Sequence, residues 1–314
     1  MTITETMPPA LKGVRAYFAP VNRAAHQATI FDPAQNGGFS LSAPPAPWVD
    51  LGWIQGFTRT SGTVISPVRA GAPATPQMQV RADLEATVKL RFESWGKLQL
   101  SLSAGTQQMN LLAASVGAPH AGSGGTAVSA VALLGGSTAT ALNVGASASA
   151  AFTAGGLVAV DVDYTSGQAG FLGSGVSGAY LRTAVTDVDY VRRVTLNVGR
   201  IINVSNGVLT LEAPLIAGVP ITSMKVSGVM GFCDREGSSF FQEWSALFAG
   251  EGQQGERVLW HYPRLQSMAG IAEESSKSEG GYQALRLQGS FRALPVSDPV
   301  DGENVVCFRS YVTG

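Results

Sequence analysis

The segment Val80 to Phe92, VRADLEATVKLRF, alternates between apolar and polar residues without a break. Every even position is apolar, and the odd positions are polar and carry both signs of charge. This period of two is typical of a β-strand with one buried and one polar face. At about 3.3 Å per residue such a strand would be about 43 Å long, roughly twice the usual length. A strand of this length needs a large sheet or a partner chain to cover it.

The composition agrees with an all-β fold. The chain of 314 residues contains 38 glycines, 16 prolines and only 14% charged residues, which favours turns and strands over helices. Its length allows one large β domain or two smaller ones. The formal net charge of -1 argues against a general nucleic-acid-binding protein, which would carry a basic excess.

No catalytic or metal-binding motif stands out. Cys233 and Cys307, the only cysteines, lie in apolar segments, so we expect buried, reduced thiols with no catalytic role. The segment GSGVSG at 173–178 matches a dinucleotide fingerprint only formally, because no helical pattern follows it. Two aspartate pairs with i, i+2 spacing could bind a cation, although this spacing usually marks the solvated face of a strand: Asp161 with Asp163, and Asp187 with Asp189. We expect no cofactor, no bound metal and no enzymatic activity.

The sequence also bears on location. The opening residues, MTITETMPPALKG, are polar and interrupted by proline rather than typical of a secretory signal. Apolar runs such as AVSAVALL are shorter than the roughly 18 residues that a membrane span requires. We expect a soluble protein that folds in a cytosol and does not enter a membrane.

Periodicity and composition divide the chain into four parts. The expected parts are an N-terminal arm (1–47), a β core (48–97 and 219–314), an Ala/Gly/Ser-rich segment without charges (98–156) and a small inserted β subdomain (157–218). The uncharged segment suits either a packed interface or a mobile linker. Within the inserted subdomain, Asn206-Gly207 marks a hairpin turn between two strands.

One segment is predicted to be a helix. In SSFFQEWSALFAG, residues 238–250, five large apolar residues fall on one helical face: Phe240, Phe241, Trp244, Leu247 and Phe248. Ser239 and Gln242 could form a capping box, and Gly250 a C-terminal stop. The segment 95–116 fits a strand or a helix equally well.

Three strand-like runs follow the predicted helix: VLWHYPRLQ, YQALRLQGSFRA and NVVCFRSYV. The middle run repeats the pattern of the segment 80–92, because apolar residues alternate with Arg286, Gln288, Ser290 and Arg292. The connection LPVSDPVDGEN carries Pro, Asp and Gly in positions that favour tight turns.

The order of these elements resembles that of tail tube (major tail) proteins of tailed bacteriophages. The resemblance covers roughly 48–95 and 219–312. It rests on DLGWIQGF, a loop and the long strand, followed by an apolar strand, GSSFFQEWSALFAG, HYPRLQ, YQALRLQGSFRALP, DPVDGE and VVCFRSYV. It implies an all-β, tail-tube-like β-sandwich or barrel with one flanking α-helix and an inserted small β subdomain.

The resemblance also implies a function without chemistry. Such subunits form hexameric rings whose sheets merge, the rings stack into a tube, and DNA transits the lumen without specific binding. Expected partners are copies of the chain itself and other tail proteins, such as tape measure, terminator and baseplate or tip proteins, and the expected location is the virion tail. The alternative is a capsid decoration or receptor-binding β module that uses the insert for recognition. A carbohydrate-active enzyme is a third possibility, but clustered acidic residues do not stand out.

Two sets of residues are candidates for contacts in such an assembly. A ring would cover the mixed-charge face of the long strand and of its C-terminal counterpart, at a subunit interface or in the lumen, and this set is Arg81, Asp83, Glu85, Lys89, Arg91, Arg286 and Arg292. The expected long loop at 58–79 would reach the next ring, because its prolines reduce the entropy lost on docking. Its candidate contact residues are Arg69, Pro73 and Pro76.

Overall fold

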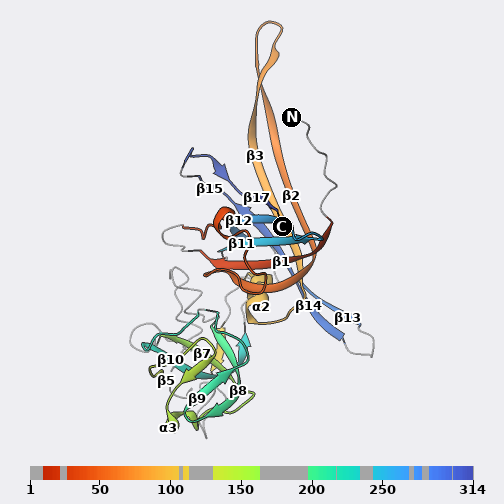
Figure 1. Cartoon of the computed structure of the whole chain (residues 1–314). Coiled ribbons are helices and arrows are strands. Elements are labelled where there is room, and N and C mark those ends of the chain that lie inside the picture. Colours follow the sequence, from red (N-terminus) through yellow and green to blue (C-terminus); the bar gives the residue numbers. More distant parts are fainter. Residues whose placement is uncertain are drawn as a thin grey trace. The chain divides into compact units, whose positions relative to one another are not determined.

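The computed structural model in Figure 1 describes residues 10–21, 27–105, 109–112, 130–162, 197–216, 218–233, 243–268, 272–277, 283–298 and 300–313. Most of these residues are in antiparallel β-strands, which confirms the all-β prediction. The chain divides into two compact units. The first unit comprises Met1–Val21, His26–Gly105 and Phe241–Gly314, and the second comprises Asn22–Ala25 and Thr106–Phe240.

The first unit is built on one 8-stranded sheet with the order β13-β14-β3-β2-β1-β11-β12-β17. Its strands are β1 (Leu11–Pro20), β2 (Val49–Ala70), β3 (Thr75–Phe92), β11 (Glu243–Gly252), β12 (Arg257–Ser267), β13 (Ala272–Lys277), β14 (Gln283–Leu294) and β17 (Phe308–Val312). Strand β14 pairs with β12 as well as with β3. This second pairing closes β14, β3, β2, β1, β11 and β12 into a barrel, which removes most free edges from the sheet.

Aromatic side chains fill the barrel. Phe18 of β1 lies at its centre, with ring centroids 6.0 Å from Phe248, 5.7 Å from Phe291 and 6.4 Å from Trp244. Phe248 also contacts Tyr262, at 6.0 Å. All of these side chains are almost completely buried. Large aromatic side chains supply most of the buried apolar area in such a core.

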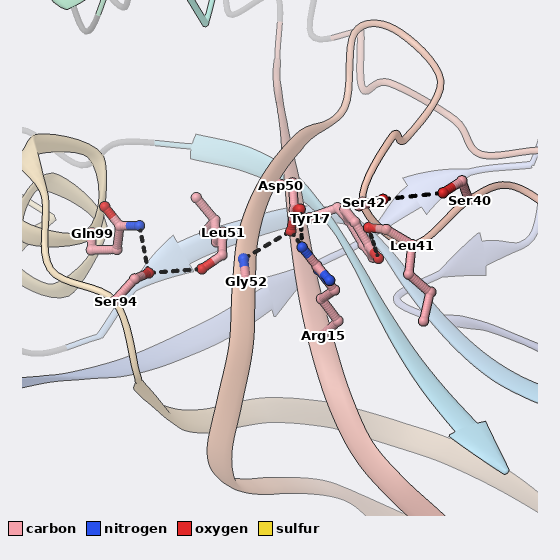
Figure 2. Close-up of polar contacts among 10 residues, drawn as sticks. All are labelled: Arg15, Tyr17, Ser40, Leu41, Ser42, Asp50, Leu51, Gly52, Ser94 and Gln99. Atoms are coloured by element: carbon pink, nitrogen blue, oxygen red, sulfur yellow. Dashed lines mark hydrogen bonds and ion pairs between the residues drawn. The ribbon is translucent and has the colours of Figure 1, made fainter. Parts of the chain in front are cut away.

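Residues 27–48 cover the outer face of β1, β11 and β12. This segment contains the short helix α1 (Pro33–Asn36). Phe31 and Trp48 pack with Tyr17 and Leu247 in one buried cluster. The Tyr17 hydroxyl also donates to the Leu41 carbonyl at 2.8 Å (Figure 2). The sheet is therefore buried on both faces at this point.

The prediction of an N-terminal arm at 1–47 is wrong for residues 11–20, which form β1 between β2 and β11. Phe18 points into the barrel and Tyr17 under the covering segment, so both faces of β1 are buried. A strand buried on both faces loses its apolar–polar alternation. The burial of both faces therefore explains the weak periodicity that suggested an arm.

The predicted helix is also wrong for residues 243–250, which belong to β11. Phe248 faces the barrel, whereas its neighbour Leu247 packs beneath the covering segment. With both faces apolar, the run has no period of two and mimics a helical face. Residues 238–242, including the predicted capping box, lie outside the described residues.

The segment at 95–116, which fitted either structure, forms helix α2 (Lys97–Ala104) in its first part. The helix ends at Gly105, which has the left-handed φ of 62°. The short strands β15 (Val296–Ser297) and β16 (Asn304–Val305) form a separate ribbon after β14. None of the helices among the described residues is long and apolar enough to cross a membrane.

Polar contacts join β1, β2 and α2 around one glycine (Figure 2). The Arg15 guanidinium donates to Asp50 across the β1–β2 pair, 2.9 Å from Nε to Oδ1, and this hydrogen bond raises the pKa of Arg15. The same carboxylate accepts from the backbone N–H of Gly52 at 2.8 Å. Gly52 has a φ of 82°, a conformation that a side chain would strain.

The second unit has its own sheet, with the order β4-β10-β7-β8-β9-β6 and β5 paired with β10. Its elements are β4 (Met109–Leu112), β5 (Val131–Ala132), β6 (Ala141–Asn143), α3 (Ala146–Ser149), β7 (Leu157–Val162), β8 (Val198–Ser205), β9 (Val208–Leu211) and β10 (Met224–Cys233). Strand β10 was predicted to belong to the β core at 48–97 and 219–314 but pairs with β7 of the second unit instead. Leu142, Val160, Leu209 and Val226 belong to the buried core.

The predicted hairpin turn at Asn206-Gly207 is confirmed. It joins β8 to β9, and both residues have positive φ angles, 49° at Asn206 and 80° at Gly207. Two successive positive φ angles are typical of a type I′ turn, for which Asn-Gly is the preferred pair.

Candidate subunit interface

Strands β2 and β3 extend far beyond the barrel as a two-stranded hairpin (Figure 1). Strand β1 pairs with β2 only as far as Ile54, and β14 pairs with β3 only between Thr87 and Arg91. Every residue from 60 to 85 is exposed. We call residues 60–85 the hairpin arm. Its two strands have no other strand partner among the described residues, so the arm has two open edges.

The hairpin arm exposes an apolar stripe. Cross-strand pairing places Val80 opposite Ser66, and Met78 opposite Val68, so the side chains of each pair share a face of the ribbon. The stripe consists of Val64, Val68, Met78 and Val80, which are 57%, 46%, 60% and 40% exposed. A bulge shifts the register of β3 between the partners of Val64 and Ile65, so Leu84 lies on the opposite face of the ribbon. That opposite face continues into the barrel core as Ala86 and Val88.

The strand predicted at 80–92 is therefore present within β3, but only its second half packs on the core. Val80 and Leu84 were expected to be buried with the rest of the apolar face and are instead exposed on the hairpin arm. The barrel supplies neighbouring strands only from residue 87 onward. The first half of the strand therefore exposes apolar side chains that the first unit leaves uncovered.

The predicted loop at 58–79 is wrong, because β2 runs to Ala70 and β3 begins at Thr75. Arg69, Pro73 and Pro76 lie at the tip of the hairpin arm, where Arg69 pairs with Pro76. Proline suggested a loop because it cannot donate to a sheet. Each strand of the arm has one open edge, so a missing N–H on that edge breaks no hydrogen bond.

The odd-numbered face of β3 forms a charged surface together with β14. The register places Lys89 opposite Ser290, and Thr87 opposite Arg292. Glu85 forms an ion pair with Arg292 at 2.8 Å. The structure brings five of the seven predicted residues together on this charged face: Glu85, Lys89, Arg91, Arg286 and Arg292. The other two, Arg81 and Asp83, lie farther out on the hairpin arm.

Gln55 of β2 extends the charged face. It accepts a hydrogen bond from Arg286 at 3.3 Å and donates one to Glu93 at 2.9 Å. The described side chains of the charged face and of the adjoining part of the arm include five basic and three acidic residues: Arg81, Lys89, Arg91, Arg286 and Arg292, and Asp83, Glu85 and Glu93. A surface richer in basic groups attracts phosphate and would retain DNA.

No pattern in the sequence predicts the polar cluster that lies at the base of the hairpin arm. Arg59 Nε donates to the Tyr262 hydroxyl at 2.9 Å, and the Cys307 thiol lies beside both groups. Burial raises the pKa of Tyr262 to about 12 and also raises the pKa of Cys307. Cys307 is free and half-buried rather than fully buried as expected. The side chain of Cys233 lies outside the described residues.

His261 occupies a buried position beneath the covering segment. Its Nε2 lies 3.2 Å from the Thr29 carbonyl, and its ring contacts the rings of Trp48 and Phe308. Burial lowers the pKa of His261 to about 4. The other two histidines, His26 and His120, lie outside the described residues.

This burial predicts acid sensitivity of the first unit. An unfolded histidine has a pKa of about 6.5, so between about pH 6.5 and pH 4 the unfolded state binds a proton that the folded state excludes. The folded state should therefore lose stability as the pH falls, by about 3 kcal/mol in total below pH 4. Urea unfolding at a series of pH values measures this slope. The His261→Gln variant should show a flatter dependence over the same window, and an unchanged slope would contradict the assignment.

The described residues contain no group of three or more His, Cys, Asp or Glu side chains that could hold a metal ion. Of the aspartates considered for cation binding, Asp163, Asp187 and Asp189 lie outside the described residues, as does the segment 173–178. Within the described part of the chain, the hairpin arm combines exposed apolar side chains with two open strand edges, and a covering partner would stabilise it. In comparisons with protein-family models and with curated proteins, the chain matches no family model and no curated sequence.

Proposed function

We propose that the protein is a structural subunit that assembles with copies of itself into stacked rings and forms the tail tube of a bacteriophage, the conduit for its genome. The observation that carries this proposal is the hairpin arm. An isolated two-stranded hairpin is at best marginally stable in water. An arm that also exposes four apolar side chains on one face gains stability when another protein surface covers it.

A second copy of the chain fits as the covering surface. The arm extends for about ten residues beyond the barrel, or about 33 Å, which is enough to reach well into a neighbouring molecule. Such a contact joins different surfaces of the two copies, and repeated contacts of this kind produce rings or filaments. The net charge of -1 does not oppose the close packing of many copies. The ring number of six rests on the resemblance to tail tube proteins alone.

Charge reversal on the arm tests whether its charged residues take part. The change Asp83→Lys with Glu85→Lys should leave the isolated chain folded, because Glu85 and Arg292 form an exposed ion pair that contributes at most about 1 kcal/mol. Assembly should be lost, because like charges at a partly covered contact cost roughly several kcal/mol of binding free energy. This cost recurs in every subunit of the assembly. Circular dichroism reports the fold, and sedimentation velocity reports assembly.

A matched control is Glu212→Lys with Glu303→Lys, which makes the same charge change at two exposed residues outside the hairpin arm. The control should assemble like the wild-type protein. If the arm variant forms tubes that pass DNA more slowly at low salt, the residues line the lumen instead. If it assembles and passes DNA normally, Asp83 and Glu85 belong to ordinary solvent-exposed surface.

A decoration or receptor-binding role is the second candidate, and one observation favours it. The second unit has a buried core of its own, which suits a recognition module. Its described residues include only four charged ones, Asp161, Arg200, Glu212 and Lys225. A decoration module would stay a monomer or small oligomer until it met a capsid shell, whereas a tube subunit would form rings or polymers alone.

A further inference from the structure

The hairpin arm leaves the barrel at an irregular point in β2. The pairing of β2 with β3 shifts between Gln55 and Thr58, and Gly56 has a φ of 60°, which a side chain would strain. Immediately after this bulge, the Phe57 ring packs 4.9 Å from Phe248 and 5.1 Å from Trp260. The chain is thus fastened to the barrel core directly before the arm begins.

Arg59, two residues farther along β2, adds a polar contact to this apolar one. It pairs with Val88, whose side chain is completely buried, so Arg59 lies on the barrel side of the ribbon. Its Nε donates to the hydroxyl of Tyr262, a residue that is only 1% exposed. Placing a charged arginine beside a barrel filled with aromatic rings costs free energy unless the N–H groups of its guanidinium are hydrogen-bonded.

We infer that Arg59 is a positioning residue, held by Tyr262, that fixes the direction in which the hairpin arm leaves the barrel. Apolar packing around Phe57 holds the base of the arm but has little directional preference. A hydrogen bond of 2.9 Å has a narrow range of angles, and tilting the arm would break it and leave a buried hydroxyl without its donor.

The direction of the arm matters because the arm is long. Over about 33 Å, a tilt of about 10° at the base displaces the tip by about 6 Å, which exceeds the spacing of about 4.8 Å between neighbouring strands. A partner surface that fits the arm in one direction would be missed after such a displacement. This consequence for assembly rests on the proposed function, but the direction of the arm in the isolated chain does not.

The test measures the direction of the arm in the unassembled protein. Nitroxide labels are attached to ketone-bearing unnatural residues at the exposed positions 77 and 253, at the arm and in the turn between β11 and β12, so that both native cysteines remain. Pulsed electron paramagnetic resonance then gives the distance distribution between the labels. The wild-type chain should show one narrow distribution. The variants Arg59→Gln and Tyr262→Phe should each show a roughly twofold broader one, since only non-directional contacts then hold the base.

Two further variants sharpen the result. Arg59→Lys retains a donor and should restore part of the wild-type narrowness, whereas Arg200→Gln in β8, the matched control, should change nothing. Tyr262→Phe removes a single hydroxyl, so it decides the question if Arg59→Gln does not fold. Unchanged distributions in both anchor variants would overturn the inference even if the protein assembles. A wild-type chain that never assembles would refute the proposed function while leaving the distance measurement valid.

Discussion

Replacing the whole apolar stripe of the hairpin arm with serine is expected to abolish self-assembly and leave the barrel folded. The four changes are Val64→Ser, Val68→Ser, Met78→Ser and Val80→Ser. These side chains are 40–60% exposed, so the free energy of unfolding should change by only about 0.5 kcal/mol per site. If each contributes about 1 kcal/mol when a second copy covers it, the affinity of each contact falls roughly 10³-fold. Sedimentation velocity over a concentration series measures the loss.

A four-serine variant of the second unit provides the control. Its sites, Ile202, Val219, Ile221 and Met230, are 54–66% exposed and lie outside the hairpin arm. This variant should assemble at the same concentration as the wild-type protein. Normal assembly by the arm variant would show that the stripe is not a subunit contact, and equal loss in both variants would indicate that the effect is not specific to the arm.

The second large effect concerns the barrel core. Phe248→Ala is expected to destabilise the first unit by about 3–5 kcal/mol, the usual cost of truncating a buried phenylalanine. The Phe248 ring is completely buried and touches Phe18, Phe57 and Tyr262, so its removal leaves a cavity between three strands. Urea unfolding followed by tryptophan fluorescence measures the change.

The matched variant Phe248→Leu retains most of the volume and should cost about 1.5 kcal/mol or less. A loss of under about 1 kcal/mol for Phe248→Ala would place the ring outside a close-packed core and contradict the barrel described here. Because Phe57 packs on Phe248 at the base of the hairpin arm, the alanine variant should also weaken assembly through the arm.

Strands with one polar face could be predicted from the sequence. The run at 80–92 lies in β3, and the alternation around Arg286 and Arg292 lies in β14, because each strand keeps one face toward water. The Asn-Gly turn was predictable because few other residue pairs accept two positive φ angles. The candidate charged residues on β3 and β14 could be named because both strands present their polar face on the same side of the sheet.

The errors have a common physical origin in tertiary structure. β1 and β11 are buried on both faces, so their sequences show no alternation, and β11 in particular resembled an apolar helix. The hairpin arm was mistaken for a loop because its prolines are tolerated only where a strand has an open edge. Arg59 and Tyr262 lie far apart in the sequence, and no local pattern indicates that they meet.

Self-assembly through the hairpin arm can be seen by negative-stain electron microscopy of the purified wild-type protein, with the four-serine arm variant prepared in parallel. Rings or stacked tubes are expected for the wild-type chain and single particles for the variant. Wild-type protein that remains monomeric at every concentration at which it stays in solution, or tubes formed equally by both proteins, would contradict assembly through the hairpin arm.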